Sequence, residues 1–179
     1  MATLTVFTPT YNRAYVLKQS YDSLCRQTCK DFVWLIVDDG SSDNTKEIVE
    51  KWMANDNGFE IRYVYKQNGG MHTGHNKAYE LIDTELNVCI DSDDFMPDDA
   101  VELIVNFWKE NKDSSYSGIL ALDVYKNGQV IGKELPNKKS TTLSGYYQNG
   151  GQGDKKLIYR TEIINKYPPY PEFEEEKFV

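Results

Sequence analysis

The apolar residues of the chain fall into short runs that are separated by longer amphipathic stretches. Four runs are rich in Val, Ile and aromatic residues and are almost continuously apolar: residues 4–8, 33–37, 61–65 and 87–90. Such runs are typical of strands that are covered on both faces, as in a parallel sheet. Four other stretches carry apolar residues near helical spacing: residues 14–28, 44–54, 73–82 and 97–109. This alternation predicts an α/β fold with a mostly parallel central sheet flanked by helices.

The last third of the chain is less regular. After about residue 112, residues 119–125 read as a strand, and Asn127-Gly128 predicts a hairpin turn into residues 129–132. Residues 157–159 and 163–167 are expected to be short ordered elements before a proline-rich segment. The chain ends abruptly after an acidic and apolar segment, which suggests that more protein originally followed.

Polar residues gather where the four predicted strands end. The segments that follow the strands are residues 8–13, 38–43, 66–70 and 91–94. In open parallel sheets, ligands bind outside the carboxyl ends of the strands. We therefore expect these four loops, which are distant in sequence, to converge on one site. Pro97 is expected in the first turn of the helix that follows the last of these loops.

Of the four segments, Asp91-Ser92-Asp93-Asp94 gives the most specific indication of function. In an extended segment alternate residues point the same way, so Asp91 and Asp93 could present oxygens to one divalent cation. Mg²⁺ and Mn²⁺ prefer carboxylate oxygens. Carboxylates this close repel one another unless a cation lies among them. The competing interpretation is an acidic turn that only caps the following helix.

The charge balance limits the classes of partner. The chain has 179 residues and a net charge of −8, so nucleic acid is not expected as a partner. An acidic protein that binds phosphate needs a cation, in agreement with the proposed metal site. The absence of any long apolar run predicts no transmembrane segment, and three cysteines without a CxxC pair favour reduced thiols in the cytoplasm.

Taken together, the strand-end segments resemble the nucleotide-binding half of the family 2 glycosyltransferases. The matching pieces are Thr8-Pro9-Thr10-Tyr11-Asn12-Arg13, Val37-Asp38-Asp39-Gly40-Ser41-Ser42-Asp43-Asn44-Thr45, Asn68-Gly69-Gly70 with Asn76, and Asp91-Ser92-Asp93-Asp94. The resemblance implies the GT-A fold, a Rossmann-like nucleotide-diphospho-sugar transferase fold. It implies a nucleotide-sugar-binding half over residues 1–112 and an acceptor-side half of the same domain, incomplete at its C-terminus, over residues 113–179.

The resemblance also implies roles for individual residues on the donor side. Thr8, Thr10 and Tyr11 would line the base pocket, and Asp39 would accept a hydrogen bond from the uracil N–H. Asp91 would hold the ribose or a metal-bound water, and Asp93 would bind the metal that bridges the diphosphate. The remaining residues expected to contact the nucleotide are Asn68, Gly70 and Ser92.

On the acceptor side the family places an acidic general base. In this chain it falls among Glu174, Glu175 and Glu176, and Glu176 fits best because Lys177-Phe178 follows it. Glu175 is the alternative, since three consecutive glutamates leave the register open. The family's further C-terminal region is absent.

The reaction that the resemblance implies is a single in-line displacement with inversion. The donor would be a UDP-sugar or another nucleotide-sugar, and Mn²⁺ or Mg²⁺ would neutralise the departing diphosphate. The acceptor would be a carbohydrate or a lipid-linked saccharide, as in polysaccharide biosynthesis, with peripheral membrane association as a possible accompaniment.

Two other classes compete with this interpretation. A phosphorelay receiver domain also has an acidic pair after a strand. However, a whole strand–helix unit precedes Asp38 here, and nothing supplies the later Thr and Lys-Pro strand ends. A non-catalytic nucleotide-sugar-binding module is the second alternative. Donor hydrolysis without transfer to an acceptor would favour an incomplete enzyme.

Overall fold

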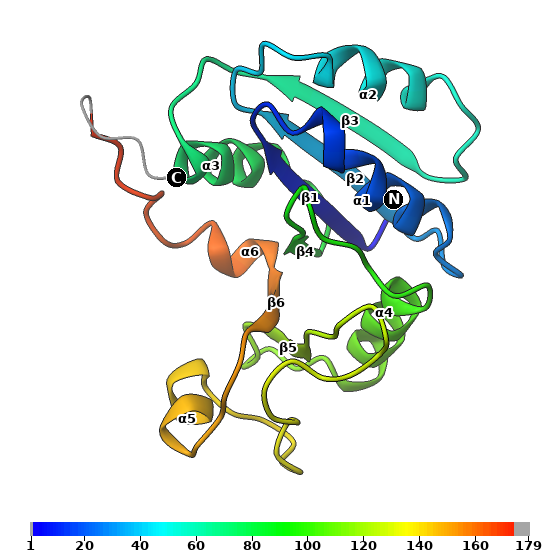
Figure 1. Ribbon diagram of the computed structural model, residues 1–179. Coiled ribbons are helices and arrows are strands. Elements are labelled where there is room, and N and C mark those ends of the chain that lie inside the picture. The colour runs from blue at the N-terminus through cyan, green and yellow to red at the C-terminus, as the bar shows by residue number, and fades with distance from the viewer. Residues whose placement is uncertain (1, 174–179) are drawn as a thin grey trace.

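The structure is a computed structural model that describes residues 2–173, and its strands and helices alternate along most of the chain (Figure 1). The strands are β1 (Leu4–Thr10), β2 (Phe32–Asp38), β3 (Glu60–Tyr65), β4 (Leu86–Cys89), β5 (Gly118–Leu122) and β6 (Lys155–Arg160). The helices are α1 (Ala14–Cys25), α2 (Thr45–Met53), α3 (Met71–Leu81), α4 (Ala100–Asn111), α5 (Leu143–Gln148) and α6 (Thr161–Ile164).

The strands form one sheet in the order β3-β2-β1-β4-β6-β5. β1 pairs in parallel with β2 and β4, and β2 pairs in parallel with β3. β6 runs antiparallel to both β4 and β5, so the later part of the chain extends the same sheet. The predicted α/β fold with a mostly parallel sheet is confirmed. The four parallel strands end at the same edge, as Figure 1 shows for β1, β2 and β3.

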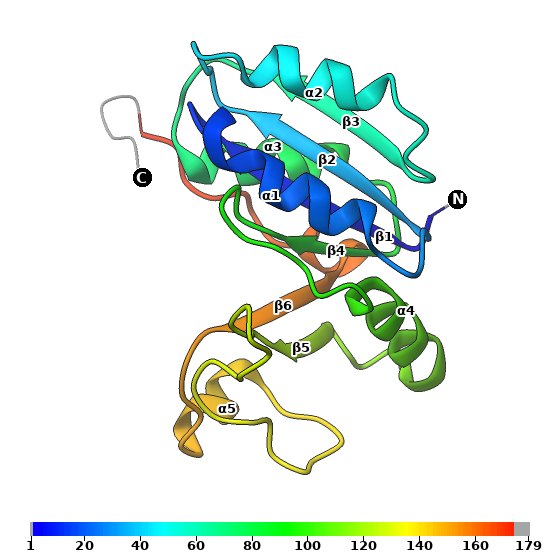
Figure 2. The ribbon, with the colours of Figure 1, turned by 45° about the vertical axis from the view of Figure 1, so that its right-hand side comes forward.

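The two faces of the sheet are covered by different helices (Figure 2). Along β2, Phe32, Trp34 and Ile36 pack with residues of α1, α2 and α4 on one face. The alternate residues Leu35 and Val37 pack with α3 on the other face. Because side chains alternate across a strand, burial on both faces makes the strand sequence almost continuously apolar. This is the pattern that revealed the strands in the sequence.

The sequence-based boundaries differ from the structure at several ends. Helix α1 ends at Cys25 rather than residue 28, and α4 begins at Ala100 rather than at Pro97. Pro97 therefore precedes the helix, and its carbonyl accepts a hydrogen bond from the Ala100 N–H at 3.0 Å. The predicted hairpin over residues 119–132 is reduced to strand β5 and one bridge between Val124 and Val130.

Helix α5 was not predicted from the sequence. It has only six residues, and Tyr146 is its buried residue. The Thr142 hydroxyl caps it by accepting a hydrogen bond from the Gly145 N–H. A helix this short shows too little periodicity to be recognised from sequence, because the helical period needs a window of about 11 residues or more.

A cluster of aromatic rings lies beneath the first loop of the site. Tyr21 and Trp52 stack with ring centroids 4.4 Å apart, and the fully buried Trp34 packs beside both, with centroids 6.2 and 5.9 Å away. Its Nε1–H donates to the Thr8 hydroxyl at 3.0 Å, so the polar edge of the indole is satisfied. The cluster thereby supports the carboxyl end of β1 from the face that α1 and α2 cover.

The packing of α1 against the sheet can be tested with a pair of leucines. Leu17 in α1 is fully buried, whereas Leu103 in α4 is 61% exposed. Leu17→Ala removes buried methyl groups and leaves a cavity, so we expect the free energy of unfolding to fall by about 2–5 kcal/mol. Leu103→Ala, the matched control, is expected to change it by less than about 0.5 kcal/mol. Urea denaturation followed by circular dichroism measures both, and equal effects would contradict the described packing.

Candidate active site

Polar contacts link the loops after β1 and β2. Asn12 adopts a left-handed backbone conformation with φ of 52°, which asparagine tolerates better than most residues. Its backbone N–H donates to the Ser41 hydroxyl at 2.9 Å, and its side-chain oxygen accepts from the Ser42 N–H at 2.8 Å. The Asp43 carboxylate accepts from the Ala14 N–H at 3.0 Å, at the start of α1. The first two loops therefore form one unit.

Asp39 links the loop after β2 to the loop after β3. Its side chain is 5% exposed, and its two carboxylate oxygens receive four donors. The donors are Lys66 Nζ at 2.5 Å, Asn68 Nδ2 at 3.1 Å, Gly69 N–H at 3.0 Å and Gly70 N–H at 2.8 Å. Each carboxylate oxygen offers about two acceptor positions, so the capacity of Asp39 is filled.

The close approach of these two loops explains two glycines. Gly40 has φ of +88°, and a Cβ there would lie 2.8 Å from the Asn68 backbone nitrogen. Gly70 has φ of 96° and is the residue that precedes α3. Glycine adopts such positive φ values without the steric cost that a side chain brings. The second and third loops thus meet through backbone atoms as well as through Asp39.

The acidic segment after β4 forms a turn, not the extended segment that the sequence suggested. The Asp94 N–H donates to the Asp91 carbonyl at 3.0 Å. Helix α1 holds this turn through its side chains, because the Ser20 hydroxyl donates to the Asp94 carbonyl at 2.8 Å and Gln19 Nε2 donates to the Asp93 carbonyl at 2.7 Å. The backbone of the turn is therefore fixed while the carboxylates of Asp91, Asp93 and Asp94 remain exposed.

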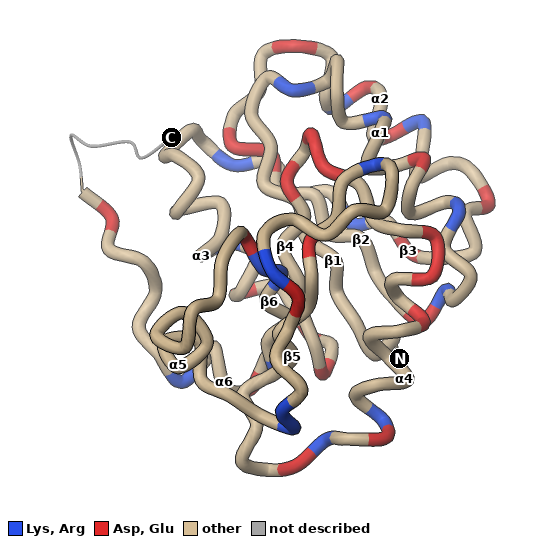
Figure 3. Tube along the Cα trace, turned by 60° about the horizontal axis from the view of Figure 1, so that its bottom comes forward, with Lys and Arg blue, Asp and Glu red and all other residues tan. Residues whose placement is uncertain are grey.

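Two basic side chains lie against the carboxylates of the turn. Arg13 Nη1 is 3.2 Å from Asp93 Oδ2, and Lys156 Nζ is 3.9 Å from Asp94 Oδ2. Burial raises the pKa of Asp94, Lys156 opposes that rise, and the charges of Asp91 and Asp93 add to it. Negative charge is thus concentrated at this turn, although charged positions of both signs are spread along the whole trace (Figure 3).

The residues predicted to contact the nucleotide differ in accessibility. Thr8 is fully buried and bonded to Trp34, whereas Tyr11 is 50% exposed. Thr10 is 4% exposed, and its hydroxyl has no hydrogen-bond partner among residues 2–173. Ser92 is 7% exposed. A buried hydroxyl without a partner is uncommon in proteins, which makes Thr10 an unusual residue of this loop.

Of the other predicted site residues, some lie within the described structure and some lie outside it. Asn68 and Gly70 both bond to Asp39, as described above. Glu174, Glu175 and Glu176 lie outside the described residues, so their role stays a prediction. Sequence analysis gave no role to Lys66 or Arg13. The only sequence signal for these two was that each stands in one of the four strand-end segments.

The oxygen donors of the acidic turn suit a hard divalent cation. Carboxylates are the ligands that Mg²⁺ and Mn²⁺ prefer, and Mg²⁺ typically takes only one or two from the protein beside substrate phosphates. Across residues 2–173, no three His, Cys, Asp or Glu side chains are grouped as a ready metal site. The residues therefore fit a cation that shares its coordination with a phosphate ligand, and not a cage made by the protein alone.

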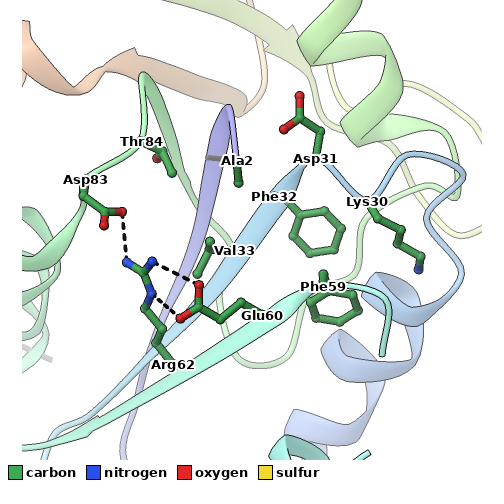
Figure 4. A pocket seen from close by; sticks show the side chains of 10 residues that line it. All are labelled: Ala2, Lys30, Asp31, Phe32, Val33, Phe59, Glu60, Arg62, Asp83 and Thr84. Atoms are coloured by element: carbon green, nitrogen blue, oxygen red, sulfur yellow. Dashed lines mark hydrogen bonds and ion pairs between the residues drawn. The ribbon is translucent and has the colours of Figure 1, made fainter. Parts of the chain in front are cut away.

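A separate hollow of about 420 Å³ lies at the opposite, amino edge of the parallel strands (Figure 4). Arg62 crosses it and bonds to Glu60 and to Asp83, each at 2.9 Å. Phe59 and Phe32 stack in its wall, with centroids 4.5 Å apart. Arg62 is already paired with Glu60 and Asp83, and the hollow lies away from the four loops, so it is not part of the candidate site.

The four loops together form a candidate ligand site at the carboxyl edge of the parallel strands. The chain matches Glycosyl transferase family 2 over residues 5–167, and it belongs to that family. It is 30% identical over 144 residues to the chondroitin synthase of Pasteurella multocida. The aligned region covers 78% of this chain and 15% of that protein. The chain therefore spans a small part of that relative's length.

Solved structures share the fold. S. aureus TarS in complex with UDP superposes with a TM-score of 0.71 at 25% identity, over 92% of this chain and 48% of that chain. A mannosyltransferase from Pyrobaculum calidifontis, solved with GDP-Man and Mn²⁺, superposes with a TM-score of 0.67 at 18% identity, over 94% of this chain and 47% of that chain. The GT-A fold is confirmed, and membership of this family rules out the receiver-domain interpretation. No helix within residues 2–173 is long and apolar enough to cross a membrane.

The role of Asp39 in holding the loops together is testable. Asp39→Ala leaves the N–H groups of Gly69 and Gly70 and the Lys66 ammonium without their acceptor. Buried donors without partners cost about 1–3 kcal/mol, so we expect a loss of that size in the free energy of unfolding. Asp22→Ala, which removes an exposed carboxylate paired with Lys18, is the control and should cost less than about 1 kcal/mol. Equal unfolding midpoints for the two variants would contradict this role.

Proposed function

We propose that this chain holds the donor-binding half and part of the acceptor side of a glycosyltransferase that moves a sugar from a UDP-sugar to an acceptor hydroxyl. One observation carries the proposal: hydrogen bonds hold four strand-end loops together, and one of these loops is the acidic turn. The fold is shared with a structure solved in complex with UDP. Residues 1–112 form the nucleotide-sugar-binding half and residues 113–179 the acceptor-side half. Because β4 pairs with β6, the two halves share one sheet.

Residues at the ends of β1 and β2 bind the nucleotide in this proposal. The exposed ring of Tyr11 contacts the base, and the unpartnered Thr10 hydroxyl gains a hydrogen bond. Asp39 can accept the uracil N–H only if one of its four donors leaves. Asn68 Nδ2 makes the longest of those bonds, 3.1 Å, and also bonds to the Asp39 carbonyl, so it is the donor that the base replaces.

In this proposal the acidic turn would hold a divalent cation that shares its coordination with the diphosphate. Asp93 is the main metal ligand in this proposal, and Asp91 holds the ribose or a metal-bound water. A bound cation would supply Lewis-acid stabilisation to the departing diphosphate. If Asp93 held a cation, Arg13, which now pairs with Asp93, would be available to donate to a phosphate oxygen. The cation and the Arg13 guanidinium would both stabilise the negative charge that develops on the leaving group.

The acceptor side supplies the base. We place this role on Glu176, with Glu175 as the alternative. It takes the proton of the acceptor hydroxyl as that oxygen attacks the anomeric carbon and the bond to the diphosphate breaks. A single displacement of this kind inverts the configuration at the anomeric carbon and needs no covalent intermediate on the protein.

The acceptor in this proposal is a carbohydrate or a lipid-linked saccharide. The relatives named chondroitin synthase and hyaluronan synthase support an acceptor of the polysaccharide class. Cytoplasmic location and peripheral membrane association remain parts of the proposal. A module that binds the nucleotide-sugar without catalysis is the alternative, and transfer to a saccharide acceptor by the full-length protein distinguishes the two.

The first functional prediction concerns the metal. UDP affinity measured by calorimetry with Mn²⁺ should exceed that with EDTA by at least about tenfold, or about 1.4 kcal/mol, because the cation offsets repulsion between the diphosphate and the acidic turn. Asp93→Ala should remove most of this dependence. Asp98→Ala removes an exposed carboxylate that pairs with Arg26 instead, so it should preserve the dependence. Equal UDP affinity with Mn²⁺ and with EDTA in the wild-type protein would refute the metal role.

The second functional prediction concerns the base. Glu176→Gln in the full-length protein should lower kcat by about 10²- to 10⁴-fold, because a general base acts on the acceptor proton in the transition state. The affinity for UDP should not change. Glu174→Gln and Glu175→Gln are the neighbouring controls. Loss of transfer in Glu175→Gln alone would move the base by one residue, and full activity in all three variants would place it elsewhere.

A further inference from the structure

The side chain of Asn76 joins two segments that are far apart in sequence. It lies on α3 and is 7% exposed. Its Oδ1 accepts from the Tyr170 N–H at 2.8 Å, and its Nδ2 donates to the Tyr170 carbonyl at 2.9 Å and to Glu172 Oε1 at 2.8 Å. The Asn76 amide therefore makes hydrogen bonds with both the N–H and the carbonyl of Tyr170. With the bond to Glu172, both of its N–H donors are used.

A ring contact reinforces these bonds. His75, the preceding residue of α3, meets the Tyr170 ring edge-on, with centroids 5.9 Å apart. His75 also packs against Phe7 in β1 and Tyr79 in α3, at 5.2 and 6.1 Å. Burial among these rings lowers the pKa of His75, which favours its neutral form. Tyr170 thus lies on a surface built from the sheet and α3, and both views show the chain after α6 running past α3 (Figures 1 and 2).

The N-terminal end of α3 adjoins the loop that belongs to the donor side in the proposed function. The N–H groups of Gly69 and Gly70, directly before the helix, both donate to Asp39. The helix therefore connects the loop that holds Asp39 with the segment around Tyr170. In the sequence, the three glutamates that include the proposed base come directly after Phe173.

We infer that Asn76 is a positioning residue for sugar transfer: it holds the acceptor-side segment Tyr170–Glu172 in register with the donor-binding loops. This inference rests on the proposed function. Asn76 does not touch the reacting atoms, and it acts by fixing the backbone that leads into the acidic segment. Loss of this hold should impair the transfer step while the nucleotide still binds.

Two substitutions in the full-length protein test the hydrogen bonds between Asn76 and the segment Tyr170–Glu172. Asn76→Ala removes all three hydrogen bonds. Asn76→Asp keeps the acceptor for the Tyr170 N–H but removes both donors and adds a negative charge beside Glu172. Lys77→Ala is the matched control, because Lys77 follows Asn76 in the same helix and pairs with Glu80 instead.

In Asn76→Ala, hydrogen exchange at the Tyr170 N–H should accelerate by about tenfold, as expected for the loss of a hydrogen bond. With saturating donor, kcat should fall by at least about tenfold, since a 1 Å misplacement of reacting groups can cost about 10²-fold. The affinity for UDP should stay close to that of Lys77→Ala, whereas the unfolding midpoint should fall below that of Lys77→Ala because three hydrogen bonds are lost. Asn76→Asp should lose a similar amount of kcat.

A second substitution provides rescue. Adding Glu172→Gln to Asn76→Asp supplies an amide donor to the introduced carboxylate, so kcat should recover in part. Glu172→Gln alone should have a smaller effect on kcat than Asn76→Asp. A purely structural role for Asn76 does not predict this recovery at constant UDP affinity.

The outcomes distinguish the positioning role of Asn76 from the proposed transferase function. Unchanged exchange at Tyr170, unchanged kcat, or a parallel loss of UDP affinity and kcat would each overturn the positioning role. If the wild-type protein binds UDP but transfers sugar to no saccharide acceptor, the proposed transferase function fails, and the positioning role fails with it even though Asn76 still holds Tyr170.

Discussion

The buried carboxylate of Asp39 is the constraint on which the geometry of the site depends. A carboxylate that is 5% exposed needs its lost hydration replaced, and four donors from the loop after β3 supply that replacement. Lys66 is one of them, and its ammonium also donates to the Thr73 hydroxyl in the first turn of α3 at 2.6 Å. One ion pair therefore fixes the end of β2, the glycine-rich loop and the start of a helix relative to one another.

The parallel topology turns this local constraint into a site. Parallel strands end at one edge, so the loops after β1, β2, β3 and β4 meet although they are separated along the chain. Asn12 links the first loop to the second, Asp39 links the second to the third, and α1 holds the fourth through Gln19 and Ser20. The backbone is thus fixed while Asp93 keeps a carboxylate that is 54% exposed. In the proposed function, this arrangement would bind an anionic ligand through a cation with little change in the fold.

Sequence reasoning identified the features that follow from hydrophobic periodicity and local motifs. The strands near Trp34 and Val88 are buried on both faces, so each gave a clear apolar run. The acidic residues Asp91 and Asp93 were found because they follow such a run. The turn conformation at Asp91 was not found, because it depends on hydrogen bonds from Ser20 and Gln19 in a helix about 70 residues earlier.

Long-range pairing explains the other omissions. Lys66 reads as an ordinary surface lysine until the fold brings it to Asp39, 27 residues away. Asn76 reads as a helical residue with no stated role until the chain returns to it 94 residues later. Neither contact leaves a periodic signal. A buried amide or carboxylate at the end of an element is therefore hard to assign from one sequence, even where the element itself is recognised.

Helix α3 links the contact at Asp39 and the contact at Tyr170 through one rigid element. An α-helix rises about 1.5 Å per residue, so the six residues from Gly70 to Asn76 span about 9 Å. Both ends of this span are bonded to other parts of the chain, one to Asp39 and the other to Tyr170. Gly74 lies between them without a side chain, and a Cβ there would come within 3.3 Å of Pro9 in β1. The glycine lets the helix pack closely on the strand that carries Thr10. The loop after β3 and the segment around Tyr170 are therefore held at a separation set by rigid secondary structure rather than by a flexible loop.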